Sequence, residues 1–195
     1  MDRTRGDNYR LQRREIVNAL LAEQDDLLVV TGLGAPAWDA TAAGDRDLTF
    51  PLWGAMGGAA MLGLGLALAK PDHRVLVLTG DGECLMGLGA FATIAVQAPG
   101  NLAIAVLDNE RYGETGMQET HTAANVDLAG MAKAAGFVET GTIFDEDAFN
   151  VAKAALLENK GPNLYVIKIR ADSHPIVMPP KDGVVLKERF RAALA

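Results

Sequence analysis

The feature that most constrains this chain is the alternation of short, β-rich apolar runs with longer stretches of helical periodicity. The apolar runs cover residues 27–31, 74–79, 101–107 and 163–169, and the helical stretches cover 9–23, 55–69, 84–97, 126–135 and 147–159. Strands that are apolar on both faces are typical of a parallel sheet covered by helices on both sides. We therefore predict an α/β fold, a three-layer sandwich with a central parallel sheet whose ligands bind at the carboxyl ends of the strands.

Length and charge narrow the class of protein further. The 195 residues fit a single domain, residues 1–195, with looser ends at residues 1–7 and at the last few positions. Residues 181–195 mix charged and apolar side chains and predict a helix that docks on this chain or on another. A formal charge of −7 argues against nucleic acid as a partner, because a phosphate backbone attracts basic surfaces. The single cysteine, Cys84, cannot form an internal disulfide, which indicates a reducing cytoplasm. It lies in an apolar run, which indicates a packed thiol.

One uncharged stretch, residues 48–69, is long enough in number to cross a bilayer. Pro51 interrupts it, and its five glycines make it a poor lipid-facing helix. We interpret it as a turn followed by a buried, glycine-faced helix, and we expect no membrane partner.

Polar side chains follow two of the predicted strands. Gly80-Asp81-Gly82-Glu83 follows one, and Asp108-Asn109 follows the next. In a parallel sheet the Asp81 carboxylate and the Asn109 amide oxygen can converge on one hard cation, and oxygen ligands suit Mg²⁺. So few protein ligands imply a phosphorylated ligand that completes the metal shell. The glycines let the backbone approach such a ligand, and a helix that begins near Glu83 directs N–H groups at a diphosphate.

Together the two loops resemble the signature of the thiamine diphosphate (ThDP) enzymes, a Gly-Asp-Gly followed some two dozen residues later by Asn. Here 25 residues, 83–107, separate Gly80-Asp81-Gly82 from Asp108-Asn109. The resemblance implies that Asp81, Asn109 and the main-chain carbonyl of Arg111 bind Mg²⁺. Asp108 replaces the usual first Asn, which leaves the metal-binding Asn in place. Further contacts with the cofactor are implied at Thr31, Gly32, Gly80, Gly82, Glu83 and Tyr112.

A second segment, residues 52–57, resembles the stretch before this signature in ThDP decarboxylases. The resemblance implies that the Gly54 carbonyl accepts a hydrogen bond from the aminopyrimidine of the cofactor. Met56 would be the apolar wedge that holds the two rings in the bent, reactive conformer. For Trp53 or Met56 taken alone, a place in the ordinary core is the alternative.

The resemblance covers residues 27–169 and corresponds to the diphosphate-binding domain, so the pyrimidine-binding domain is absent from this chain. That domain supplies a glutamate which activates the cofactor, so a partner chain (the α subunit) is implied, as in the two-subunit sulfopyruvate decarboxylases. Residues 108–118 and the pair His121-Thr122 resemble sulfopyruvate and phosphonopyruvate decarboxylases. The implied reaction is decarboxylation of a small anionic 2-oxoacid, with sulfopyruvate first. The alternative is a phosphonopyruvate decarboxylase or a subunit of another ThDP-dependent 2-oxoacid lyase or synthase. Apolar surface around Trp53 and Met56 favours association, with copies of the same chain if no partner is present.

Two residues beyond the metal loop, Glu114 and His121, are candidates for a catalytic role, because either can handle a proton or an anionic substrate tail. The alternatives are structural: Glu114 can satisfy backbone N–H groups in a glycine-rich turn, and His121 can cap the helix before Val126. Glu83 would repel a diphosphate unless its carboxylate turns away, and at a helix start it also interacts favourably with the helix dipole.

Two further interpretations stay open. Residues 32–37 form a Gly-x-Gly-x-x-Ala after a strand, which is a weak dinucleotide-binding pattern without a clean second strand that ends in an acid. A non-catalytic nucleotide-binding or partner-binding module of the same fold is the alternative of another class, because a fold does not determine a function.

Overall fold

The computed structural model describes residues 4–22, 24–52 and 54–194, and its centre is a six-stranded sheet in which every neighbouring pair of strands is parallel. Across the sheet the strands are β2 (Thr49–Pro51), β1 (Leu28–Thr31), β3 (Val75–Gly80), β4 (Leu102–Asp108), β8 (Asn163–Lys168) and β7 (Glu139–Ile143). A hairpin of β5 (Arg111–Tyr112) and β6 (Gln118–Glu119) stands apart and is antiparallel. The predicted α/β fold with a central parallel sheet is confirmed.

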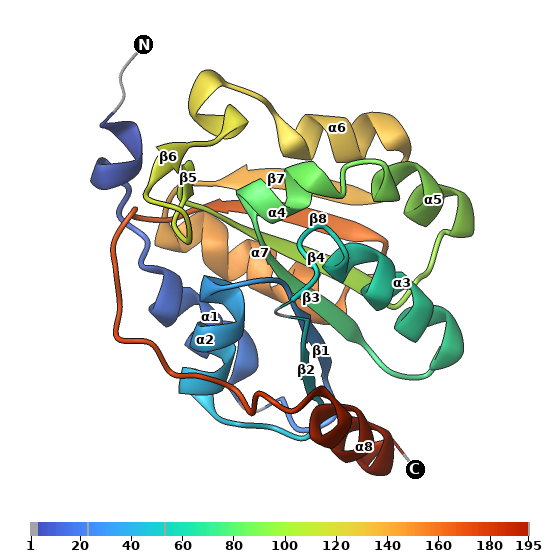
Figure 1. The fold of residues 1–195 in the computed structure, drawn as a ribbon. Helices are drawn as coiled ribbons and strands as arrows, with labels where there is room; N and C mark the ends of the chain where they lie inside the picture. The colour runs from blue at the N-terminus through green and yellow to red at the C-terminus, as the bar shows by residue number, and fades with distance from the viewer. Residues whose placement is uncertain (1–3, 23, 53, 195) are drawn as a thin grey trace.

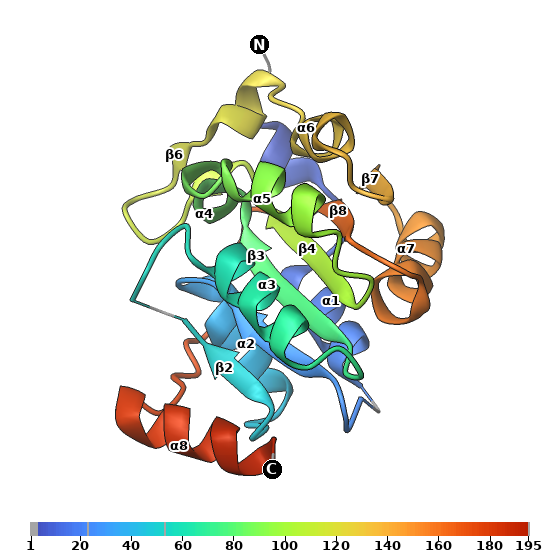
Figure 2. The same ribbon diagram turned by 90° about the vertical axis from the view of Figure 1, so that its right-hand side faces the viewer.

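Helices cover both faces of the sheet (Figures 1 and 2). Alternate residues of the strands face opposite sides. Val30 and Val77 pack with α3 (Ala59–Ala69), α5 (Ala90–Gln97), α6 (Leu128–Ala135) and Phe190 of α8 (Gly183–Ala193). Val29 and Leu78 pack on the opposite side with α1 (Arg13–Leu21), α2 (Ala35–Ala43) and α7 (Glu146–Glu158). The remaining helices are the short α4 (Asp81–Met86) and the 3-10 turns η1 (Arg5–Asn8) and η2 (His121–Ala124).

The helix expected over residues 84–97 is two helices, α4 and α5, and the break has a packing cause. A Cβ added at Gly87 would lie 2.3 Å from the backbone oxygen of Gly57, so two loops pass each other with no room for side chains. Gly57 itself has a φ of 90°, which ends the preceding turn, and α3 begins at Ala59 rather than at Ala55. The sequence pattern located these helices but did not reveal the contact that divides them.

The expected strands are present. The two edge strands, the two strands of the β5–β6 hairpin and the helix α2 were not predicted. β2 has three residues at one edge, and β7 lies at the other edge, half-buried and without an apolar run. The helix α2 begins at Ala35, directly after Gly34, which has a φ of 74°. Among the described residues, no helix combines the length and the apolar character that crossing a membrane requires.

Both ends of the described chain pack onto this domain. At the N-terminal end, η1 accepts a hydrogen bond of 3.0 Å from the Ala171 amide at the Gly6 carbonyl, and the looser end expected at residues 1–7 stays a prediction. At the other end, α8 docks on this chain: the ring of Phe190 meets that of Phe50 edge-on, with 5.7 Å between centroids. Cys84 is buried in the core as predicted, and burial raises the pKa of its thiol.

Candidate functional site

The two signature loops leave the sheet side by side. β3 and β4 pair in parallel with Gly80 opposite Leu107, so the next residues, Asp81 and Asp108, emerge from adjacent strands at the carboxyl edge. The helix α4 begins at Asp81 itself, and its first turn also carries Glu83. The sequence expectation that this edge gathers the polar loops agrees with the register of the strands.

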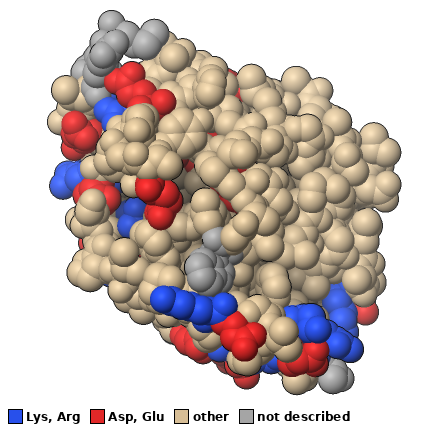
Figure 3. Space-filling view, in the orientation of Figure 1, with Lys and Arg blue, Asp and Glu red and all other residues tan. Residues whose placement is uncertain are grey.

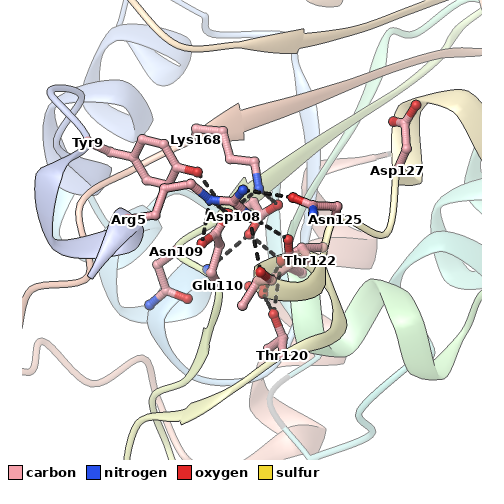
Figure 4. Close-up of polar contacts among 12 residues, drawn as sticks. Arg5, Tyr9, Asp108, Asn109, Glu110, Thr120, Thr122, Asn125, Asp127 and Lys168 are labelled. Carbon is pink, nitrogen blue, oxygen red and sulfur yellow. Dashed lines mark hydrogen bonds and ion pairs between the residues drawn. The ribbon is translucent and has the colours of Figure 1, made fainter. Parts of the chain in front are cut away.

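Hydroxyl groups link the two carboxylates. The Thr120 hydroxyl donates to Oδ2 of Asp81. The Thr122 hydroxyl, which has a single proton, lies 3.3 Å from the same oxygen and 2.8 Å from Oδ1 of Asp108, to which it donates (Figure 4). The other oxygen of Asp108, Oδ2, lies 2.7 Å from Nζ of Lys168. Asp108, which stands where the signature usually has Asn, is therefore balanced by a lysine.

The charge at Asp81 fits a bound cation. Its side chain is 2% exposed, and burial, followed by the negative charge of Asp108, raises the pKa of the Asp81 carboxyl. Among the described contacts, hydroxyl groups meet this carboxylate and no side-chain cation does. A divalent ion beside Asp81 would supply the missing positive charge.

The other proposed metal ligands lie on the loop after β4. The Asn109 amide oxygen accepts a hydrogen bond of 3.0 Å from the Arg111 amide, and its second lone pair can still face a metal. No group of three or more His, Cys, Asp or Glu side chains gathers for a metal within the described residues. One carboxylate, one amide oxygen and one carbonyl would be a sparse oxygen set, of the kind in which Mg²⁺ keeps positions for phosphate and water.

A cavity of about 580 Å³ opens over this edge of the sheet. It brings together most of the site residues that the sequence predicts: Met56, Gly80, Asp81, Gly82, Glu83, Asn109, Arg111, Tyr112 and Glu114. Its size suits a small-molecule cofactor with a substrate. The aromatic ring of Tyr112 lies against Gly82, where an added Cβ would come within 2.4 Å of the ring.

Four predicted residues do not line this cavity. Thr31 is fully buried at the end of β1, and Gly32 lies under the Glu83 carboxylate. Gly54 is exposed in the turn before α3, while Trp53 lies outside the described residues. His121 is exposed at the start of η2, and it does not cap the next helix: Asp127 does, by accepting a hydrogen bond from the Gly130 amide at 2.9 Å.

The Glu83 side chain ties neighbouring loops together. Its carboxylate accepts a hydrogen bond of 2.6 Å from the Thr79 hydroxyl and one of 3.4 Å from the Ala59 amide. Burial raises the pKa of Glu83, although these bonds and others from the Gly57 and Leu33 amides oppose the shift. The carboxylate thus has partners of its own, as expected for a side chain that does not face a diphosphate.

Two carboxylates cover the glycines of the weak dinucleotide pattern. Oε2 of Glu83 would lie 1.4 Å from a Cβ added at Gly32, and the Glu114 carboxylate lies in the same way over Gly34. A pyrophosphate seated on these glycines would meet two like charges, which disfavours that alternative. Glu114 also lines the cavity, and burial raises its pKa against the opposing charge of Arg13.

Sequence reasoning missed the side chains behind the metal loop and one wall of the cavity. Glu110 is 1% exposed and is held by Arg5, Tyr9 and Lys168. A lysine inside the apolar run 163–169 was the available signal, because a buried lysine needs a carboxylate partner. His174 is half-buried in the cavity wall, and its Nε2 lies 3.2 Å from Oδ1 of Asp172.

Comparisons with known proteins agree with this geometry. Residues 37–167 match the family of the thiamine pyrophosphate enzyme, C-terminal TPP binding domain. The chain is 36% identical over 180 residues to the sulfopyruvate decarboxylase subunit beta of Methanothermobacter thermautotrophicus, covering 92% of this chain and 94% of that one. It is 37% identical over 169 residues to the subunit beta of Methanocaldococcus jannaschii, covering 86% and 88%.

Longer relatives match over part of their length. A phosphonopyruvate decarboxylase of Streptomyces viridochromogenes is 41% identical over 175 residues, which is 89% of this chain and 44% of that protein. The crystal structure of benzoylformate decarboxylase from Polynucleobacter necessarius superposes with a TM-score of 0.69 at 18% identity, over 84% of this chain and 33% of that one. At this identity, the likeness to benzoylformate decarboxylase shows a shared fold and nothing further. By the family match and the near full-length relatives, the chain belongs to the thiamine pyrophosphate enzymes, in the family of their C-terminal TPP-binding domain.

Proposed function

We propose that this chain is the diphosphate-binding subunit of a ThDP- and Mg²⁺-dependent 2-oxoacid decarboxylase, with sulfopyruvate as the substrate. The observation that carries the proposal is the meeting of Asp81 and the Asn109 loop at one edge of the sheet, over one cavity. Relatives named sulfopyruvate decarboxylase subunit beta match over most of both chains, which favours this substrate. Phosphonopyruvate is the second candidate, favoured by the 41% identity to a phosphonopyruvate decarboxylase.

The chain's own residues would hold and orient the cofactor. Asp81, Asn109 and the Arg111 carbonyl would hold Mg²⁺, and the backbone around Gly82 would face the diphosphate. When bound, ThDP supplies a carbon nucleophile for the ketone and accepts the electrons released with CO₂. Met56, which lines the cavity, would keep the cofactor bent.

The other proposed contacts with the cofactor and the substrate differ in whether the residue lines the cavity. The Gly54 carbonyl would accept from the aminopyrimidine, with Thr31 and Gly32 behind the cofactor pocket. Glu114 lies in the cavity wall, where it can meet a substrate proton, so it is better placed for a catalytic role than His121, which lies outside the wall.

A partner chain is part of the same proposal. The relatives' name, subunit beta, implies a companion subunit in those proteins, and here an α subunit would supply the activating glutamate. The exposed side of α3 is apolar, with Met61, Leu62 and Leu68 each more than a third exposed. Figure 3 shows the surface over α3 and α5 as largely free of charged side chains, which suits a protein partner or a second copy. We keep residues 1–195 as one domain and the cytoplasm as its location within this proposal.

The test is co-expression with a companion pyrimidine-domain chain, followed by decarboxylation assays with sulfopyruvate, phosphonopyruvate and pyruvate. We expect the complex to release CO₂ fastest from sulfopyruvate, and the isolated chain to be folded and inactive. Hydrogen–deuterium exchange at C2 of added ThDP reports activation directly. Fast exchange with the isolated chain would overturn the two-chain proposal, and a complex that binds no ThDP would favour the non-catalytic module.

A further inference from the structure

The N-terminal segment lies against the back of the loop that carries two proposed metal ligands. Arg5 donates to the Glu110 carboxylate, with Nη2 2.6 Å and Nε 3.0 Å from Oε1, and its Nη1 lies 2.8 Å from Oδ1 of Asn125. The Tyr9 hydroxyl donates to the same carboxylate at 2.7 Å (Figure 4). A Cβ added at Gly6 would come within 2.8 Å of the Asn109 carbonyl oxygen, so the two backbones are in direct contact.

Glu110 has a backbone conformation that requires support. It lies between Asn109 and Arg111 and has a φ of 61°, in the left-handed region that L side chains rarely adopt. Its amide donates to Oδ1 of Asp108 at 2.9 Å, and its carbonyl accepts from the Thr120 amide at 3.0 Å. These bonds lock the turn in which the Asn109 side chain and the Arg111 carbonyl are presented.

The support comes from cations and a hydroxyl outside the loop. Nζ of Lys168 lies 2.9 Å from Oε1 of Glu110 and 5.7 Å from the centre of the Tyr9 ring. The side chains of Lys168, Glu110 and Tyr9 therefore form one packed group, which Arg5 joins through Glu110. None of them lines the cavity. They reach the metal loop from the side away from the cavity.

We propose that Arg5 and Tyr9 form an N-terminal clasp which, through Glu110, positions Asn109 and the Arg111 carbonyl for the metal. This inference rests on the proposed function, because it concerns the same site. Arg5 and Tyr9 are positioning residues: they act on the metal through the conformation of the 109–111 loop. Partners that orient metal ligands set affinity, and their loss typically weakens binding about 10–100-fold.

The experiment compares metal affinity in the assembled complex. At saturating ThDP, the free Mn²⁺ signal in electron paramagnetic resonance gives the Kd of Mn²⁺ in place of Mg²⁺. We expect Arg5→Met to raise this Kd about tenfold, with the KM for Mg²⁺ rising more than kcat falls. Arg5→Lys keeps the charge without the forked geometry and should recover part of the affinity.

A matched control removes an arginine pair elsewhere. Arg189 binds Asp45 through two nitrogens at 2.8 and 2.9 Å, and Arg189→Met should leave the Mn²⁺ Kd unchanged. Tyr9→Phe removes only the hydroxyl that donates to Glu110 and should raise the Kd in the same direction by less. If the Arg5→Met complex does not assemble, the Mn²⁺ Kd of the Tyr9→Phe complex tests the clasp instead.

The outcomes separate the clasp from the proposed function. If the wild-type complex binds Mn²⁺ with ThDP and Arg5→Met and Tyr9→Phe bind it equally well, the clasp is overturned, even where the unfolding temperature falls. A wild-type complex that binds neither ThDP nor Mn²⁺ overturns the proposed function and the clasp with it. A raised Kd in Tyr9→Phe, with no change in the Arg189→Met control, supports the clasp.

Discussion

Two buried aspartates of this chain have opposite surroundings. Asp39, in α2, is fully buried between two arginines of α1: Arg13 donates to its Oδ2 and Arg14 lies 3.1 Å from its Oδ1. Asp81, at the edge of the sheet, is almost as buried, but hydroxyl groups meet it in place of cations. The first carboxylate is balanced within the protein, and the second needs a charge from outside. Burial alone therefore does not distinguish the two carboxylates, whereas the absence of a cationic partner among the described residues makes Asp81 the candidate for a functional role.

The sharpest test of this difference is to remove the unbalanced carboxylate. Asp81→Ala should abolish Mg²⁺-dependent ThDP binding in the assembled complex, because it would remove a proposed direct ligand and not merely an outer partner, for which losses are about 10–100-fold. Asn109→Ala should act in the same direction. Calorimetric titration with ThDP measures both. Unchanged affinity in the two variants would refute the metal assignment.

Removing the balanced carboxylate should act on the fold. Asp39→Ala leaves Arg13 buried without its partner, so we expect the free energy of unfolding to fall by about 3–5 kcal/mol. Urea denaturation measures the loss. Asp45→Ala is the matched control, since Asp45 pairs with Arg189 at the surface, and it should cost about 1 kcal/mol or less. Equal losses in the two variants would remove the distinction between the buried and the exposed pair.

The apolar wall of the cavity tests whether charge alone explains the site. Met56→Ala should lower kcat about tenfold at saturating ThDP while the cofactor Kd changes less, because the wedge selects the reactive conformer. Steady-state kinetics beside calorimetry separates the two effects. An unaltered kcat would return Met56 to the ordinary core.

The smallest expected effect concerns a carboxylate with a local role. Asp145 caps α7 by accepting a hydrogen bond from the Ala148 amide at 2.9 Å. Asp145→Ala should cost about 1 kcal/mol of stability, the usual value of such a cap, and leave ThDP affinity as it is. Thermal unfolding and calorimetry check the two halves. A weakened ThDP affinity would show that an acidic residue outside the cavity lining also affects the metal, and Asp81 would no longer stand apart from the other carboxylates.

The sequence predicted the four central strands and the two loops that meet at their ends, because both depend on local pattern. Apolar runs identify buried strands, and the spacing between Asp81 and Asn109 can be read from the sequence without knowing how the elements pack. The edge strand β7 was missed because it is half-buried and polar, so its pairing with β8 alone defines it.

What the sequence did not predict depends on contacts between distant residues. The contact of Arg5 with Glu110 joins positions 105 residues apart, and no periodicity indicates it. Glu110 itself looks like an ordinary loop residue until its buried partners are seen. The lysine in β8, Lys168, was the one visible sign that buried carboxylates lie nearby.

The backbone contact between Gly57 and Gly87 limits how this chain can change by mutation. A side chain at position 87 would meet the oxygen of Gly57 at 2.3 Å, and Gly57 needs its positive φ. Neither glycine can be exchanged alone without moving the turn that carries Met56. A single substitution at Gly57 or Gly87 would therefore displace Met56, the proposed wedge, unless the other glycine changes as well. The position of Met56 in the cavity wall thus depends on two glycines that do not line the cavity themselves.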